Sequence, residues 1–174
     1  MPMTLTADTT DDLLQQPVPF LSSVMAIEPQ WIDYNGHLNM AYYNVLFDRA
    51  IDQLWLKLGI GPDYMKARNN STFTAECHVR YVRELHLGDP AQVAIWLVAA
   101  DDKRLHTFEE LRHAGDGWLS ATSENMTLHM DMDARKVARF PADIRARIQS
   151  LADSHRAAAR PDGLGRAIGM PARN

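Results

Sequence analysis

The longest periodic hydrophobic pattern in the chain lies between residues 40 and 58. Apolar and aromatic side chains recur there at spacings of three and four, the period of a helix with one buried face. Asn39 is a good N-cap residue, Gly59 is a natural C-terminal stop, and Gly61-Pro62 prevents continuation. The pattern therefore predicts a helix of about 20 residues, near 30 Å long. Its periodic positions are Met40, Tyr43, Phe47, Ala50, Ile51, Leu54, Trp55 and Leu58.

Four segments with strand-like patterns follow this helix. They are residues 71–84, 91–100, 105–113 and 118–131. The turn signals between them are Gly88-Asp89-Pro90, Asp101-Asp102 and Gly115-Asp116-Gly117, and the last of these suits a hairpin. Connections this short favour antiparallel pairing, because a parallel crossover needs a dozen or more residues.

The remaining segments complete a single domain. Residues 20–28 are apolar and predict a strand that Pro29 ends, and residues 140–155 predict a charged helix with Pro141 in its first turn. We expect one domain over residues 18–156. A flexible tail is expected at 1–17, with one short turn at 11–16, and a mobile tail at 157–174. The order predicts an α+β fold in which an antiparallel sheet of about five strands wraps around one long central helix.

Composition narrows the function classes. With 174 residues, 46% of them hydrophobic and 23% charged, the chain has room for one ordinary globular core. A net charge of −4 does not suggest nucleic acid or a membrane surface as a partner. The one cysteine, Cys77, excludes a disulfide framework and is expected to be buried and inert. Without a signal peptide pattern or an apolar run of about 20 residues, we expect a soluble cytoplasmic protein.

The candidate chemistry lies in the loop that leads into the long helix. Asp33 precedes the helix start, where backbone N–H groups are unpaired and the helix dipole is positive. These groups can hold a developing oxyanion while Asp33 acts as nucleophile or general base. The alternative is that Asp33 only caps the helix, which is the common role of Asp at this position.

The residues of this loop carry a family resemblance. The run Asp33-Tyr34-Asn35-Gly36-His37-Leu38-Asn39, followed by Tyr43 and then by Phe47-Asp48, resembles the motif of hotdog-fold acyl-CoA thioesterases. The branch is that of 4-hydroxybenzoyl-CoA thioesterase, and the similarity extends over about residues 20–142. The residue sequence from Asp33 to Tyr43 and the run Thr107-Phe108-Glu109-Glu110 most resemble a subgroup of this family. That subgroup is associated with carnitine catabolism and linked to betainyl-CoA hydrolysis.

Two departures from the family pattern make the mouth of the expected pocket less polar. Trp31 stands where many members carry a second Asp, and Met40 stands where many carry a second Asn. The resemblance still implies a thioesterase that hydrolyses a small acyl-CoA, with betainyl-CoA as a candidate. The alternatives are a hotdog hydratase or dehydratase acting on the acyl chain, and a non-catalytic module that binds acyl-CoA.

The resemblance implies roles for the catalytic loop. Asp33 would attack the thioester carbonyl or activate the attacking water. His37 either contacts the thioester or that water, or only fixes the loop. Asn39 and Met40 match the positions whose main-chain N–H groups form the oxyanion hole. Asn39 is alternatively a simple helix cap.

Five residues are expected to bind the substrate: Trp31, Tyr34, Gly36, Tyr43 and Glu76. Gly36 would provide a backbone conformation closed to other residues. The three aromatic rings either hold a quaternary ammonium group by cation–π attraction or belong to the ordinary core and rim. Glu76 either reaches the site from the same or a neighbouring subunit, or lies in a charged ladder on a solvent-facing surface.

Assembly and cofactors complete the expectations. The resemblance implies a homodimer or homotetramer with sites at the subunit interface, and an open sheet edge also favours pairing. No metal or redox cofactor is expected, because the strand histidines His106, His113 and His129 show no ligand spacing. Coenzyme A enters only as part of substrate and product. The basic residues Arg135, Lys136 and Arg139 either meet its phosphates or form a solvated cluster.

Overall fold

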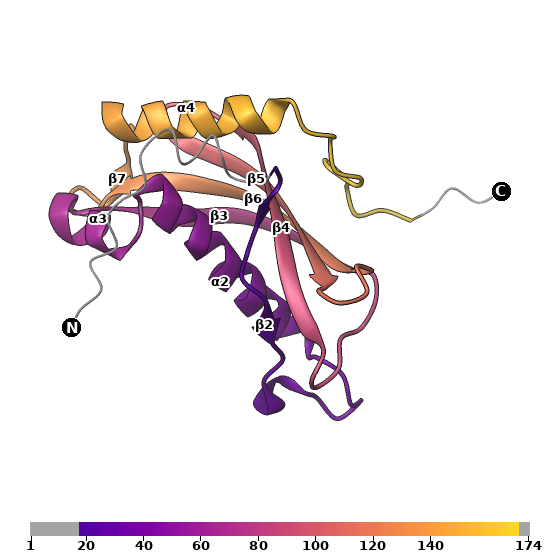
Figure 1. Cartoon of the computed structure of the whole chain (residues 1–174). Helices are drawn as coiled ribbons and strands as arrows, with labels where there is room; N and C mark the ends of the chain where they lie inside the picture. The colour runs from indigo at the N-terminus through magenta and orange to yellow at the C-terminus, as the bar shows by residue number, and fades with distance from the viewer. Residues whose placement is uncertain (1–17, 171–174) are drawn as a thin grey trace.

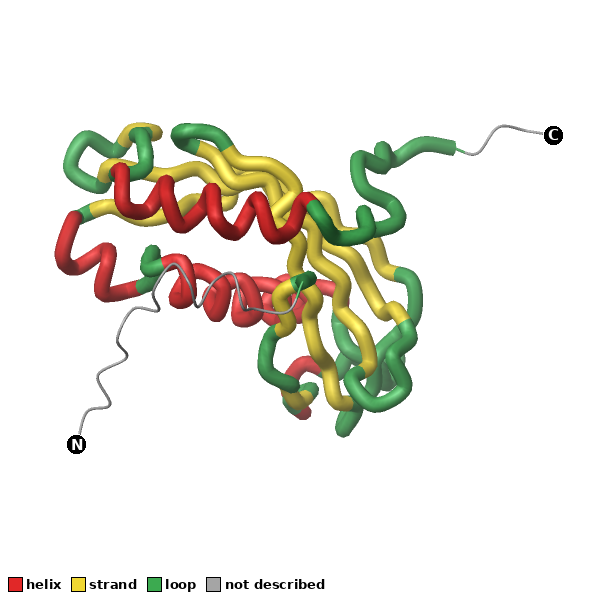
Figure 2. The backbone as a smooth tube through the Cα atoms, turned by 45° about the horizontal axis from the view of Figure 1, so that its top comes forward, coloured by secondary structure: helices red, strands yellow, loops and turns green. Residues whose placement is uncertain are grey.

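The strands form one bent antiparallel sheet. The structure is a computed structural model and describes residues 18–170; the segment 1–17, with the turn expected at 11–16, lies outside the described residues. The sheet order is β1-β4-β5-β6-β3, with β2 also paired to β4 and β7 to β6 (Figure 2). All pairs are antiparallel, as predicted. The strands are β1 (Phe20–Leu21), β2 (Met25–Ala26), β3 (Asn70–Tyr81), β4 (Pro90–Ala100), β5 (Arg104–His113), β6 (Leu119–Asp131) and β7 (Lys136–Val137).

The sheet bends around helix α2, which spans Met40–Leu58 (Figure 1). The predicted helix boundaries are confirmed: the Asn39 side chain accepts a hydrogen bond from the N–H of Ala41, and Gly59 ends the helix at φ +77°. The buried face of α2 forms the centre of the core, as its periodicity predicted, except that Met40 is exposed and Ile51 only partly buried. It consists of Tyr43, Leu46, Phe47, Ala50, Leu54, Trp55 and Leu58.

The segments flanking α2 differ from the predictions. The strand expected at residues 20–28 is interrupted after β1. The backbone N–H of Ser22 donates to the carbonyl of Val93, and the Ser22 hydroxyl accepts from the N–H of Val93. The chain then bends away before β2. A 3-10 turn, η1 (Pro29–Trp31), follows. A short helix that was not predicted, α3 (Pro62–Arg68), begins directly after Gly61. Pro62 stops α2 but starts α3, because proline suits the first turn of a helix.

The last helix packs beside β4. It is α4 (Ala142–Arg156), capped by Pro141, and it lies close to the predicted range of 140–155. Its C-terminal end contacts β4, where the backbone N–H of Leu97 donates to Nδ1 of His155 at 2.9 Å. Beyond α4 the chain forms turns without regular structure, and the N–H of Gly165 donates to Glu124 on β6 at 2.7 Å. The mobility predicted for this segment stays a prediction.

Strand β3 corrects the prediction for Cys77. A β-bulge at Ala75 shifts the register against β6 between Thr74 and Glu76. The strict alternation assumed from the sequence fails there, so Thr74 and Cys77 line the same groove. Because β3 is an end strand of the sheet, Cys77 is exposed rather than buried, with its Sγ 3.5 Å from the hydroxyl of Ser123.

Candidate active site

A tight turn places Asp33 at the start of α2. The backbones of Ile32 and Leu38 pair as a short antiparallel bridge. Inside it the N–H of Asp33 donates to the carbonyl of His37, and the N–H of Gly36 donates to the carbonyl of Asp33, both at 3.0 Å. Gly36 lies at φ +84°, a conformation that favours glycine and that the sequence analysis expected. The turn therefore holds Asp33 and His37 on a closed loop.

The two oxygens of the Asp33 carboxylate have different surroundings. Oδ1 accepts a hydrogen bond from the N–H of Asn35 at 2.8 Å, which fixes the rotamer. Oδ2 faces Nδ1 of His37 at 3.9 Å, and Nε2 of His37 lies 3.8 Å from Glu84 Oε2. Both distances exceed a hydrogen bond, so a water or substrate group can enter between the side chains. The Asp33 side chain is 15% exposed, so most of it is enclosed by the surrounding residues.

Backbone hydrogen bonds fix the junction between this turn and α2. The N–H of Leu38 donates to the carbonyl of Leu85 at 2.7 Å, and the N–H of Asn39 donates to the carbonyl of Trp31 at 2.9 Å. The Asn39 side chain then caps the helix, which confirms the capping alternative. Met40 is the first helical residue, so its N–H has no intrahelical acceptor. An N–H at this position suits a developing oxyanion.

Tyr43 helps to fix the backbone around the site. Its hydroxyl accepts the N–H of Leu85 at 3.3 Å, and its ring meets that of Tyr81 edge to face at 5.0 Å. Burial raises the pKa of Tyr43 above its usual value. The Tyr81 hydroxyl in turn donates to the carbonyl of Met40 at 3.1 Å. Both tyrosines therefore hold the first turn of α2 in place.

Within one chain, the three aromatic residues expected to bind an ammonium group are not gathered around one cavity. Trp31 is buried, stacks on Tyr42 at 5.6 Å, and has the guanidinium of Arg49 4.8 Å from its ring. Tyr34 is 97% exposed, and Tyr43 is buried beneath the loop. In this arrangement the rings of Trp31 and Tyr43 belong to the core, which is the alternative to a cation–π site given in the sequence analysis.

The remaining predicted residues lie on other surfaces. Glu76 is exposed on β3, opposite Met126 of β6, and points to the other face of the strand from Cys77. Arg135 lies in the turn before β7 at φ +50°, Lys136 begins β7, and Arg139 lies 3.4 Å from Asp102. Across residues 18–170, His, Cys, Asp and Glu side chains form no cluster of three or more suited to a metal ion. None of the described helices combines the length and apolarity that crossing a bilayer requires.

A polar groove between α2 and the sheet was missed by the sequence analysis. It encloses about 360 Å³ and holds Glu109, which is 1% exposed. Glu109 was quoted only as part of a resemblance. The available signal was its position on β5, where it lies at a spacing of two from Thr107 and Leu111, on the same face as these buried residues and Leu105, and so had to face inward. The groove is lined by Asn44, Val45, Phe47, Asp48, Ile51, Thr74, Cys77, Glu109, Ser123, Asn125 and Thr127.

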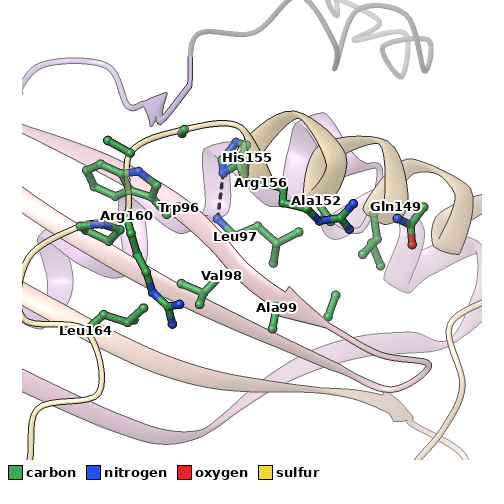
Figure 3. Close-up of a pocket in the computed structure, with 15 residues that line it drawn as sticks. Trp96, Leu97, Val98, Ala99, Gln149, Ala152, His155, Arg156, Arg160 and Leu164 are labelled. Carbon is green, nitrogen blue, oxygen red and sulfur yellow. Dashed lines mark hydrogen bonds between the residues drawn. The ribbon is translucent and has the colours of Figure 1, made fainter.

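A second cavity, of about 390 Å³, lies between β4, α4 and the segment after α4 (Figure 3). Its walls include Trp96, Leu97 and Leu164, with His155 and Arg160 at its edge. None of the predicted site residues lines this cavity, so it is separate from the loop of Asp33.

The fold and site together define the class of protein. A bent antiparallel sheet around one long helix, with an acidic turn at the N-terminus of that helix, is the hotdog arrangement of thioesterases. The sequence profile described as the thioesterase-like superfamily matches residues 27–148. The chain belongs to this family and is a thioester hydrolase, which confirms the predicted fold and enzyme class.

Individual relatives agree with this assignment. The chain is 40% identical over 143 residues to betainyl-CoA thioesterase from Pseudomonas aeruginosa, covering 82% of this chain and 90% of that protein. It is 35% identical over 144 residues to L-carnitine dehydrogenase/betainyl-CoA thioesterase from Rhizobium meliloti, covering 83% of this chain but 29% of that longer protein.

Solved structures show the same fold. A Staphylococcus aureus protein, described as hypothetical and in complex with coenzyme A, superimposes with a TM-score of 0.80 at 28% identity. The match covers 86% of this chain and 94% of that one. A proposed thioesterase from Pseudomonas putida KT2440 gives a TM-score of 0.76 at 33% identity, covering 88% and 98%.

Proposed function

We propose that this protein hydrolyses betainyl-CoA to the free acid and coenzyme A, with Asp33 as the catalytic carboxylate. The placement of Asp33 carries the proposal: one oxygen is held by the turn, and the other faces His37 at the start of α2. The relative with 40% identity acts on betainyl-CoA by its name, which supports this choice of acyl group. The proposed enzyme is cytoplasmic and works as a homodimer or homotetramer with its sites between subunits.

The carboxylate of Asp33 has two possible roles in this reaction. As a nucleophile, it attacks the thioester carbon, expels the coenzyme A thiolate and leaves a mixed anhydride that water hydrolyses. As a general base, it takes a proton from water while the water oxygen attacks the same carbon, and the tetrahedral intermediate then expels the thiolate. In both routes the Met40 N–H stabilises the carbonyl oxygen as it becomes negative.

Release of free thiol from a small panel of acyl-CoA thioesters tests this proposal. The panel includes betainyl-CoA and its neutral isostere 3,3-dimethylbutanoyl-CoA. We compare the wild type with Asp33→Asn, which keeps an oxygen to accept the Asn35 N–H and so preserves the turn. The variant is expected to lose about 10²-fold or more in kcat. The matched control is Asp63→Asn, since Asp63 is a carboxylate in the first turn of another helix.

The outcomes separate the candidates. Full activity in Asp33→Asn would remove Asp33 from the chemistry and direct attention to His37. No thiol release by the wild type from any thioester would overturn the proposal, leaving a hydratase or a non-catalytic acyl-CoA-binding protein. Equal kcat/KM for betainyl-CoA and its neutral isostere would exclude recognition of the ammonium charge.

A further inference from the structure

The groove between α2 and the sheet contains a buried carboxylate oxygen without a hydrogen-bond partner. Oε1 of Glu109 accepts from Nδ2 of Asn125 at 3.0 Å and from the hydroxyl of Thr107 at 3.3 Å. Oε2 of Glu109 is buried and has no hydrogen-bond partner among the residues that the structure describes. A buried polar atom without a partner is costly, so such atoms are rare unless a ligand or function uses them.

The charged residues that line the groove are all acidic. Asp48 on α2 lines the same space as Glu109, and its negative charge contributes to raising the pKa of Glu109. No Lys, Arg or His occurs among the residues that line the groove. Burial is the larger cause and raises the pKa of Glu109 to about 8. A cation placed between the two carboxylates would reverse this effect by favouring the ionised form.

The other walls indicate the kind of cation. Val45, Phe47 and Ile51 supply apolar surface beside the two carboxylates. A hydrated metal ion requires several oxygen ligands and polar surroundings. An alkylated ammonium group instead places methyl groups against apolar and aromatic side chains while its charge faces a carboxylate. The mixture in this groove fits the organic cation.

We infer that the groove between α2 and strands β3, β5 and β6 is a binding site for a small quaternary ammonium group, with Glu109 as its principal anionic partner. The site stands on the groove alone and not on the proposed hydrolysis: a free quaternary ammonium compound would bind here even in a protein that cleaved no thioester. It therefore goes beyond the chemistry assigned to Asp33.

The position of the groove along α2 leaves two sources for this cation. Asn44 and Asp48 lie about 6 and 12 Å along the helix axis from Met40. Only two covalent bonds separate the carbonyl carbon of a betainyl group from its nitrogen. An acyl group whose carbonyl sat at Met40 of the same chain would therefore not reach Asp48. The cation is either the acyl group of a thioester presented by a second subunit or a free small molecule.

Calorimetric titration of the full-length protein with choline tests the site directly. Choline is expected to bind saturably, whereas its neutral isostere 3,3-dimethylbutanol is expected to show no saturable binding. Glu109→Gln keeps the side-chain volume and an oxygen for Asn125, and it should weaken choline binding about tenfold or more. Asp48→Asn should weaken it in the same direction. Glu110→Gln is the matched control, because Glu110 is equally placed on β5 but pairs with Arg112 at 2.7 Å.

Each result of these measurements either supports or overturns the inferred ammonium site. Equal binding of choline and the neutral isostere, or unchanged choline binding in Glu109→Gln, would overturn the inference. Thermal melting of the variants at or above the wild-type temperature would show that lost binding reflects the site rather than the fold. Competitive inhibition of betainyl-CoA hydrolysis by choline would identify the cation as the acyl group of the substrate. Choline binding without competition would identify a site for a free cation, and it would stand even if Asp33 proved dispensable.

Discussion

The Nδ1 atom of His155 accepts a hydrogen bond from the backbone N–H of Leu97 at 2.9 Å. Pairing of β1 with β4 ends at Ile95, so the edge of β4 beyond that point is open to α4. The imidazole of His155 takes the place of a strand partner there. Because Nδ1 must stay unprotonated to accept this hydrogen bond, this contact between the helix and the sheet requires the neutral form of His155.

His155 should therefore reduce the stability of the folded protein as the pH is lowered, over a range set by its pKa values in the unfolded and folded states. Burial lowers the pKa of His155 to about 4. Between the unfolded value near 6.5 and this folded value the unfolded chain binds more protons, so the contribution of His155 to stability is complete above pH 6.5 and is lost as the pH falls toward 4. The loss amounts to about 3 kcal/mol across the window.

Urea denaturation at a series of pH values from 4.5 to 7.5 measures this loss. His155→Leu should be less stable at pH 7.5, because the Leu97 N–H loses its acceptor, and its deficit relative to the wild type should shrink as the pH falls toward 4.5. His86→Leu is the control, since the side chain of His86 is 53% exposed. Parallel curves for the wild type and His155→Leu would contradict the assignment.

The helix cap at Asn39 is expected to matter for stability. Asn39→Ala removes the acceptor of the Ala41 N–H and should lower the free energy of unfolding by about 1 kcal/mol. Asn39→Asp keeps an acceptor and should retain most of that stability. Chemical denaturation of the two variants checks the difference. Equal losses in both would mean that the amide nitrogen of Asn39, rather than its oxygen, is what stabilises the loop.

The left-handed conformation of Gly36 should link the turn to catalysis. Gly36→Ala meets no steric contact within 4 Å but must adopt φ +84°, which costs about 1 kcal/mol. Any relaxation of the turn moves Asp33, so thiol release should fall by more than the loss of stability explains. Gly117→Ala is the matched control, because Gly117 has φ +74° and equally open space in the hairpin between β5 and β6. Equal activity in the two variants would separate Gly36 from the site.

The sequence predicted the features that local rules control. The boundaries of α2 follow from Asn39 and Gly59, whose side chain and backbone determine the two ends without help from the rest of the fold. The bulge at Ala75 has no such local signature, so Phe73 was assigned wrongly to the same face as Cys77. The groove around Glu109 depends on residues from α2, β3, β5 and β6 meeting in space, which periodicity along one strand does not reveal.

The ionisation of Glu109 gives the last prediction. Its pKa of about 8 lies above the usual 4.5, so between these values the folded protein holds a proton that the unfolded chain has released. This contribution opposes that of His155 up to about pH 6.5, so a net decrease in stability is expected as the pH rises from about 6.5 to 8. The titratable groups that line the groove with Glu109 are Asp48 from α2 and Cys77 from β3, and the negative charge of Asp48 adds to the effect of burial on the pKa of Glu109.

Glu109→Gln should remove this decrease and make the protein more stable than the wild type by a few kcal/mol near pH 8. The decisive measurement is urea denaturation between pH 5 and 8.5 for the wild type, Glu109→Gln and the control Glu110→Gln. Only Glu109→Gln should flatten the curve. Choline should flatten the wild-type curve too, since a cation in the groove favours the ionised carboxylate and stabilises the folded state as the pH rises. A wild-type curve that choline leaves unchanged would mean that the charge of Glu109 and the cation do not meet.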